Sequence, residues 1–130
     1  MKDILIPISP GELLDKITIL RIKAARIEDA DKLKNVNTEL AMLEKVWNDS
    51  VPGDATIEQL TRELTGINEA LWDIEDDIRD EERNRRFGDR FIELARSVYV
   101  TNDQRAEAKK KINLHLGSTI VEEKSYQDYT

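Results

Sequence analysis

The sequence of 130 residues contains no cysteine, only 3 proline and 5 glycine residues, and few aromatic side chains. The absence of cysteine excludes a disulfide framework, a thiolate zinc site and a cysteine nucleophile. No apolar run approaches the length of a membrane span, and the segment before Pro10 is too short and wrongly flanked for a signal peptide. We therefore expect a soluble, cytoplasmic protein with no membrane segment.

Charge is abundant and unbalanced, with 36% charged residues and a formal net charge of −7. Such a charge repels polyphosphate backbones, so nucleic acid is disfavoured as a partner. Abundant charge with little glycine or proline is typical of long helices with solvated faces. The chain length suits one domain over residues 1–130, since no linker rich in glycine, serine or proline divides it.

A long amphipathic helix is predicted over Ile57–Arg83, where apolar residues recur at alternating steps of three and four. Shorter helices are predicted before it, over 10–27 and 33–47, and after it, over 89–99 and 101–116. Short connections make consecutive helices antiparallel neighbours. The expected fold is therefore all-α, an antiparallel helical bundle of about five helices.

The predicted helix ends depend on recognisable capping residues. Ser9, Pro10 and Glu12 form a capping box with a favourable proline, Thr101 and Gln104 form another, and Gly117 ends the last helix. The alternating apolar residues of segment 1–8 suit an extended arm. The tail from 118 to 130 either pairs with that arm as a short β element or adds one more helical turn.

The first predicted helix is apolar on more than one side. Leu13, Ile17 and Leu20 form its main stripe, while Leu14, Ile19 and Ile22 lie off it. Such a helix is either central in its own bundle or packed on a second chain. We therefore expect a homo-oligomer that associates through this helix.

A polar stripe lies at the edge of the core on the long helix. It comprises Asn68, Trp72, Glu75, Arg79 and Glu82, and the last predicted helix offers a matching stripe of Arg105, Lys109 and Asn113. One interpretation is an intrahelical ion pair from Glu75 to Arg79. The other is a polar pocket in which Trp72 forms an apolar wall and the cations meet the glutamates or grip a small anionic ligand.

Metal binding is a further hypothesis for the same stripe, because Glu75 and Glu82 could share Mg²⁺. No other cofactor is evident. The neighbouring Asp73, Asp76, Asp77 and Asp80 point away from the apolar stripe and are expected to form a solvated face. Glu12 and Asp15 could also be metal ligands, but capping and the helix dipole already explain acidic residues in a first turn. Neither a Ser-His-Asp arrangement nor a phosphate-binding glycine loop is present.

Several segments resemble a family of short bacterial and marine-phage proteins described only as a domain of unknown function. The segments are 9–20, 68–79, 91–96, 101–106 and 120–126. The resemblance implies one intact helical domain and no particular activity. Two weaker likenesses concern smaller sets of residues. The acidic pairs Glu12–Asp15 and Asp73–Asp76 resemble the Mg²⁺-binding acids of all-α nucleoside-triphosphate pyrophosphohydrolases. Four arginines resemble those of helical chorismate mutases: Arg21, Arg26, Arg79 and Arg105.

Our leading functional hypothesis is a self-associating helical module that binds a protein partner or a small anion along the Trp72, Glu75 and Arg79 stripe. The alternative is a Mg²⁺-dependent small-molecule enzyme, such as an all-α nucleotide phosphohydrolase. No nucleophile or base is evident in the sequence, and the residues leave open whether the protein is an enzyme.

Overall fold

The computed structural model describes all residues from Met1 to Thr130 and contains four helices and no strand. The helices are α1 (Pro10–Arg26), α2 (Ala30–Ser50), α3 (Ala55–Arg83) and α4 (Asp89–His115). None of them combines the length and hydropathy of a membrane-spanning segment. The all-α prediction is confirmed, and the long helix has nearly the predicted bounds.

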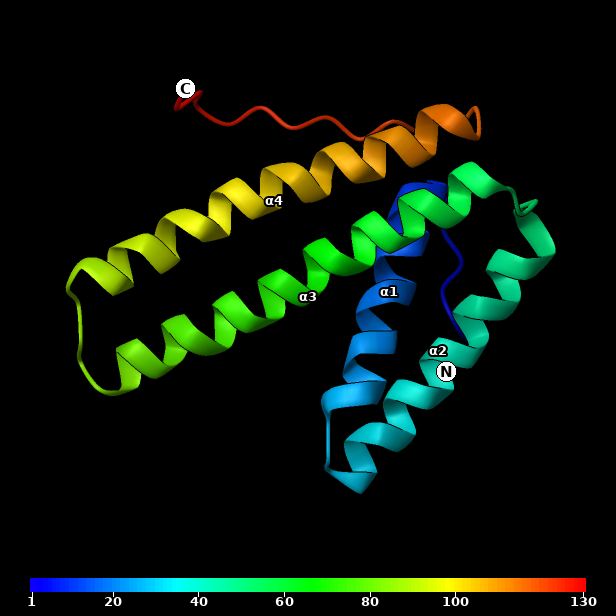
Figure 1. Cartoon of the computed structure of the whole chain (residues 1–130). Helices are drawn as coiled ribbons and strands as arrows, with labels where there is room; N and C mark the ends of the chain where they lie inside the picture. The colour runs from blue at the N-terminus through cyan, green and yellow to red at the C-terminus, as the bar shows by residue number, and fades with distance from the viewer.

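The helices form two antiparallel hairpins that cross each other (Figure 1). One hairpin consists of α1 and α2, and the other of α3 and α4. The helix α1 contacts all three others, whereas the backbone of α2 lies beside α1 alone. The distal parts of α3 and α4 extend beyond α1 as a two-helix arm (Figure 1). The fold is therefore a pair of crossing hairpins and not the predicted bundle of five helices.

The prediction of two helices over 89–99 and 101–116 is wrong, because α4 runs without a break from Asp89 to His115. Thr101 lies inside this helix instead of capping a new one. Threonine, asparagine and aspartate each cost only about 0.5 kcal/mol relative to alanine within a helix, and no glycine or proline forces a stop here. A capping-box pattern alone does not end a helix that packs along its length.

The predicted β pairing of the termini is also wrong, since segments 1–8 and 118–130 contain no strand. The C-terminal segment, residues 118–130, runs back along α4 (Figure 1). It meets the start of α1 only through side chains, where the Ser9 hydroxyl donates to Glu122 Oε1 at 2.9 Å. Residues 1–7 are exposed, and Ile8 is half-buried. Charged side chains of the tail therefore find partners on α4 in place of a backbone ladder.

Capping residues set most of the helix ends. The side chains of Ser9, Asp29 and Asp54 accept backbone hydrogen bonds at the starts of α1, α2 and α3. Gly117 adopts a φ of +64° after α4, and the Ser118 N–H donates to the Asn113 carbonyl at 2.9 Å. This is a Schellman ending, which requires the left-handed conformation that glycine adopts without strain. The predicted roles of Ser9 and Gly117 are confirmed.

The core lies where α1 crosses the second hairpin. It is formed by Leu14, Ile57, Leu60, Leu64, Ala108 and Ile112, with Trp47 of α2 packed against it. Both apolar stripes of α1 are buried, since Ile17 and Leu14 are 0% and 2% exposed. The central position of α1 accounts for its two-sided character within one chain. Association through this helix stays a prediction, and its burial adds no support to it.

Gly11 allows α1 to approach α4 closely. A Cβ atom at this position would lie 2.8 Å from Asn113 Oδ1 and closer still to the Lys109 carbonyl oxygen. The Gly11 N–H donates to the same Asn113 oxygen at 2.7 Å. We expect Gly11→Ala to lower the free energy of unfolding by about 1–3 kcal/mol, because the helices must separate.

Gly66 provides the matched control, because it lies inside α3 with open space around its Cβ position. Gly66→Ala should raise the free energy of unfolding by about 0.5–1 kcal/mol, as alanine is the better helix former. Urea denaturation of both variants measures the difference. Equal effects of the two substitutions would contradict the close approach at Gly11.

Candidate functional site

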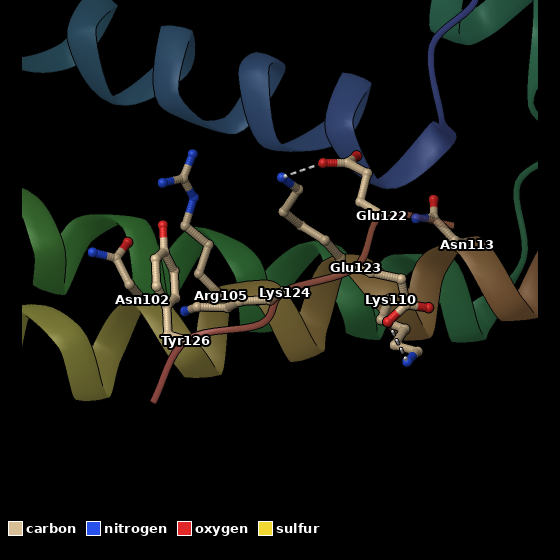
Figure 2. A pocket seen from close by; sticks show the side chains of 10 residues that line it. Asn102, Arg105, Lys110, Asn113, Glu122, Glu123, Lys124 and Tyr126 are labelled. Atoms are coloured by element: carbon tan, nitrogen blue, oxygen red, sulfur yellow. Dashed lines mark ion pairs between the residues drawn. The ribbon is translucent and has the colours of Figure 1, made fainter. Parts of the chain in front are cut away.

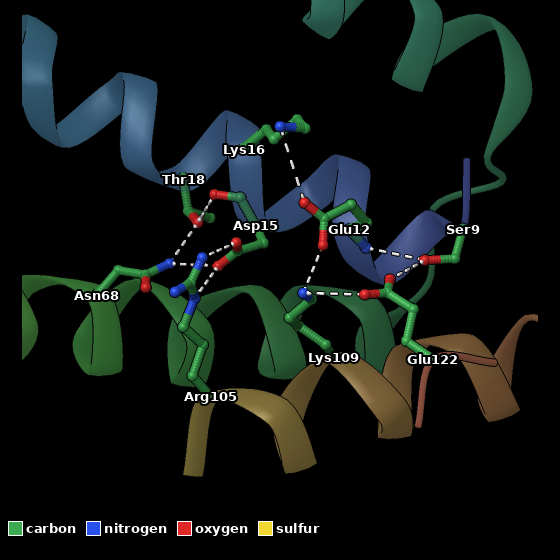
Figure 3. Close-up of polar contacts among 9 residues, drawn as sticks. All are labelled: Ser9, Glu12, Asp15, Lys16, Thr18, Asn68, Arg105, Lys109 and Glu122. Carbon is green, nitrogen blue, oxygen red and sulfur yellow. Dashed lines mark hydrogen bonds and ion pairs between the residues drawn. The ribbon is translucent and has the colours of Figure 1, made fainter. Parts of the chain in front are cut away.

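A buried polar cluster joins α1, α3 and α4 (Figure 3). Asp15 is only 1% exposed and accepts two hydrogen bonds from Arg105, one of them from Nε to Oδ1 at 2.9 Å. The Asn68 side-chain amide donates to Asp15 Oδ1 and to Thr18 Oγ1, both at 3.0 Å. Thr18 in turn donates to the Asp15 carbonyl at 2.8 Å. Every polar group of this cluster that is shielded from water therefore has a partner.

The cluster fixes the orientation of Arg105. Its hydrogen bonds with Asp15 raise the pKa of the Arg105 guanidinium above its ordinary value, although burial acts in the opposite direction. A pair of charge-assisted hydrogen bonds to one carboxylate holds the planar guanidinium in one position. The remaining N–H groups of Arg105 have no acceptor within the chain and stay available to a ligand.

A second group of charges lies at the start of α1 (Figure 3). Lys109 of α4 forms an ion pair with Glu12 and lies 3.5 Å from Glu122 of the C-terminal segment. Glu12 also lies 3.8 Å from Lys16. Ser9 uses its hydroxyl both to cap α1 and to donate to Glu122. The predicted capping box is thus only half formed, because the Glu12 side chain turns to Lys109.

Two neighbouring cavities open beside these clusters. The first, the Trp72 cavity, has a volume of about 410 Å³ and lies between α1, α3 and α4. It is lined by Ile19, Ile22, Lys23, Asn68, Leu71, Trp72, Glu75, Asp76, Arg79, Asn102 and Arg105. Arg26 lies over the Trp72 ring, with 5.8 Å from its guanidinium carbon to the ring centroid. The cavity combines one apolar wall with a few charged and amide groups, as ligand sites commonly do.

The second, the Lys109 cavity, has a volume of about 420 Å³ and lies between α4 and the C-terminal segment (Figure 2). It is lined by Asn102, Arg105, Ala106, Lys109, Lys110, Asn113, Glu122, Glu123, Lys124 and Tyr126. Only Asn102 and Arg105 line both cavities. These two side chains therefore form the wall between them.

Most of the candidate residues from the sequence fall into these cavities. Asn68, Trp72, Glu75 and Arg79 line the Trp72 cavity together with Arg105. The intrahelical pair between Glu75 and Arg79 is present at 3.1 Å. The two interpretations of this stripe are thus compatible, because the ion pair lies on the wall of the cavity.

The other candidate residues from the sequence lie outside the Trp72 cavity. Lys109 and Asn113 line the Lys109 cavity, and Glu82 lies on the surface outside both cavities. One of the two alternatives from the sequence pairs Arg105 and Lys109 with Glu75 and Glu82, and the structure shows other partners. Arg105 is bound to Asp15 and Lys109 to Glu12, because α1 crosses the hairpin of α3 and α4 and presents its own carboxylates to α4.

Metal binding receives no support from the geometry. Nowhere in the chain do three or more histidine or carboxylate side chains come together in an arrangement that could hold a metal ion. Glu75 is engaged by Arg79, and Glu82 is exposed. The neighbouring acidic residues form the expected solvated face, since Asp73, Asp76, Asp77 and Asp80 are all exposed.

From the sequence, Glu12 and Asp15 are candidates only as metal ligands, and their role opposite the cations of α4 is not predicted. Glu12, Asp15 and Thr18 follow one another at steps of three along α1, opposite Arg105, Lys109 and Asn113 at steps of four along α4. These spacings place each set on one helix face. The spacing therefore predicts an acidic face on α1 and a cationic face on α4. It does not pair them, because the capping role of an acidic first turn already explains the carboxylates.

Arg105 and Asp15 should respond unequally to substitution. In Arg105→Gln the Asp15 carboxylate stays buried without its cation, and we expect a loss of about 3 kcal/mol in the free energy of unfolding. In Asp15→Asn the guanidinium, which is 30% exposed, regains water, and the loss should be about 1 kcal/mol. Urea denaturation of both variants and the double variant measures the coupling. A larger loss for Asp15→Asn would contradict this account.

His115 contributes to a separate contact away from the cavities. Its Nε2 lies 2.8 Å from Oδ2 of Asp54, the residue that caps α3, and this hydrogen bond lowers the pKa of Asp54. The depressed pKa means that the stabilisation is full above the ordinary aspartate value, near pH 4, and is lost as the pH falls through the folded-state pKa. The contact between Asp54 and His115 links the start of α3 to the end of α4.

We expect Asp54→Asn to reduce the loss of stability on acidification, because asparagine still caps the helix but does not titrate. The free energy of unfolding, measured in urea between about pH 6 and pH 3, should fall less steeply for this variant than for the native chain. Identical slopes would show that Asp54 does not contribute to the pH dependence of the free energy of unfolding.

Comparison with known proteins gives a family but no activity. The model of DUF6165, described as a family of unknown function, matches residues 4–129. No curated protein and no solved structure matches the chain. Four of the five segments that carry the resemblance noted from the sequence supply side chains to the two cavities.

Proposed function

The chain belongs to DUF6165, a family of unknown function, and from the geometry of this member we propose that it is a binding module for a small organic anion. The ligand occupies the Trp72 cavity and carries one anionic group beside a planar or apolar part. The single observation that carries this proposal is Arg105, fixed by a buried carboxylate yet open to the cavity on its other side.

Arg105 suits an anion because it is already oriented before binding. Asp15 and Asn68 hold the cluster together, so little conformational freedom is lost when a ligand meets the guanidinium. Its free N–H groups match the geometry of carboxylate or phosphate oxygens. Lys23 lines the same cavity without an ion partner, whereas the third cation of the lining, Arg79, is paired with Glu75.

Trp72 suits the other part of the ligand. Ile19, Ile22 and Leu71 line the same cavity as its ring, and together they offer apolar surface to a planar group. Arg26 covers the ring and pairs with Asp73 at 2.5 Å, so the indole is held in place from outside. The cavity volume of about 410 Å³ lies within the range of small-molecule sites. Its mixed lining supports a small molecule over a protein partner.

The test uses Trp72 as its own reporter. In a Trp47→Phe background, Trp72 is the only indole, and phenyl phosphate or benzoate should change its fluorescence on binding. For ligands of this size we expect a Kd of about 1 mM. A concentration ten times the Kd should then raise the free energy of unfolding by about 1.4 kcal/mol, which thermal denaturation detects.

Lys23→Gln should weaken binding of phenyl phosphate by about fivefold while leaving stability unchanged, because Lys23 has no partner in the protein. Lys34→Gln is the matched control, since Lys34 lies exposed on α2, away from the cavity. Equal weakening by both variants would indicate a net-charge effect and contradict the site. Absence of any fluorescence change with either anion would contradict the proposed function.

A further inference from the structure

The Lys109 cavity has a lining that is unusual for this protein. Among its lining residues four are cationic (Arg105, Lys109, Lys110 and Lys124) and two are carboxylates (Glu122 and Glu123), whereas the whole chain carries a net charge of −7. Both carboxylates come from the C-terminal segment. The lining residues of α4 include no carboxylate, and two of their cations, Arg105 and Lys109, pair with Asp15 and Glu12 of α1.

Donors without acceptors also face this cavity. Asn113 is only 2% exposed; its oxygen accepts from the Gly11 N–H, and its amide nitrogen has no acceptor within the chain. Figure 2 shows this nitrogen on the side of the cavity, toward Glu122. Asn102 lines the cavity without any side-chain hydrogen bond in the chain, and Arg105 keeps free N–H groups. No side-chain nitrogen that is fully shielded from water lacks a partner, so these donors face the open space of the cavity, where a ligand could accept from them.

The carboxylate of Glu122 shows which chemistry the site accepts. One of its oxygens accepts from the hydroxyl of Ser9, which is itself 2% exposed, at 2.9 Å, and the other lies 3.5 Å from Lys109 Nζ. The N-cap residue of α1 and a lysine of α4 thus both approach the Glu122 carboxylate. The tail supplies that oxyanion as a tethered group.

The C-terminal segment is held by side chains, since its backbone forms no ladder with α4. Lys124 and the Tyr129 hydroxyl both meet Asp103, the Tyr129 ring packs against Tyr99, and Lys110 lies 3.9 Å from Glu123. Glu122 is 47% exposed, so an external anion can reach its carboxylate from solvent and compete for Ser9 and Lys109.

We propose that the Lys109 cavity is a second binding site, for a small oxyanion such as a phosphate or a carboxylate, and that Glu122 is its built-in competitor. None of Ser9, Lys109 and Asn113 lines the Trp72 cavity, so binding at this site is measured separately from the proposed function, although both cavities share Asn102 and Arg105. Displacement of Glu122 opens the cavity, and the anion takes the place of its carboxylate between Ser9, Lys109 and Asn113.

The experiment is calorimetric titration of the full chain with inorganic pyrophosphate and, in a separate arm, with citrate. Glu122→Gln removes the competing charge and should tighten binding of the preferred anion about fivefold relative to the native chain. Lys110→Gln, at a partly exposed position on the cavity wall, should weaken it by a similar factor. The arm that responds identifies phosphate or carboxylate chemistry.

Glu93→Gln is the matched control, because it removes one negative charge from an exposed position of α4 outside both cavities. Equal tightening by Glu93→Gln and Glu122→Gln would overturn the proposal, as would undetectable binding of both anions to Glu122→Gln at about 10 mM. Trp72→Leu should leave pyrophosphate binding unchanged, so failure here is distinguishable from failure of the Trp72 site. Circular dichroism verifies that each variant is folded.

Discussion

The ion pair between Asp15 and Arg105 is the contact on which the rest of the structure depends. A carboxylate that is 1% exposed is tolerated only when it is fully paired, so α1, α3 and α4 must meet where Asp15 can reach both Arg105 and Asn68. This requirement fixes the register of the two hairpins. It also leaves the outer N–H groups of Arg105 between two cavities, where one cation can face ligands on either side.

Hydrophobic packing alone would not define this register so tightly. The core beside the pair consists of leucine, isoleucine and alanine side chains, which tolerate repacking when volume is kept. Close approach at Gly11 and the hydrogen bond from its N–H to Asn113 add a second geometric constraint at the same crossing. The polar contacts therefore select one arrangement among the helix crossings that the apolar stripes permit, and the same contacts form the candidate sites.

The sequence identified some parts of the site better than others. Trp72, Glu75, Arg79 and Asn68 were grouped correctly because they lie on one helix, where spacing translates directly into a shared face. The partners of Arg105 and Lys109, Asp15 and Glu12, do not follow from spacing, because they depend on how α1 crosses the hairpin of α3 and α4. Local spacing gives no signal for Glu122, since its approach to Ser9 joins residues 113 positions apart and requires the tail to fold back along α4.

The sequence by itself determined the helical class, the bounds of α3 and the capping roles of Ser9 and Gly117, because helix periodicity and capping are local interactions between residues a few positions apart. The tertiary structure alone decided that α4 continues through Thr101, that the tail lies along α4 without a strand, and that carboxylates of α1 meet cations of α4. These features follow from packing between distant segments, whose free energy exceeds the small local preferences that the sequence displays.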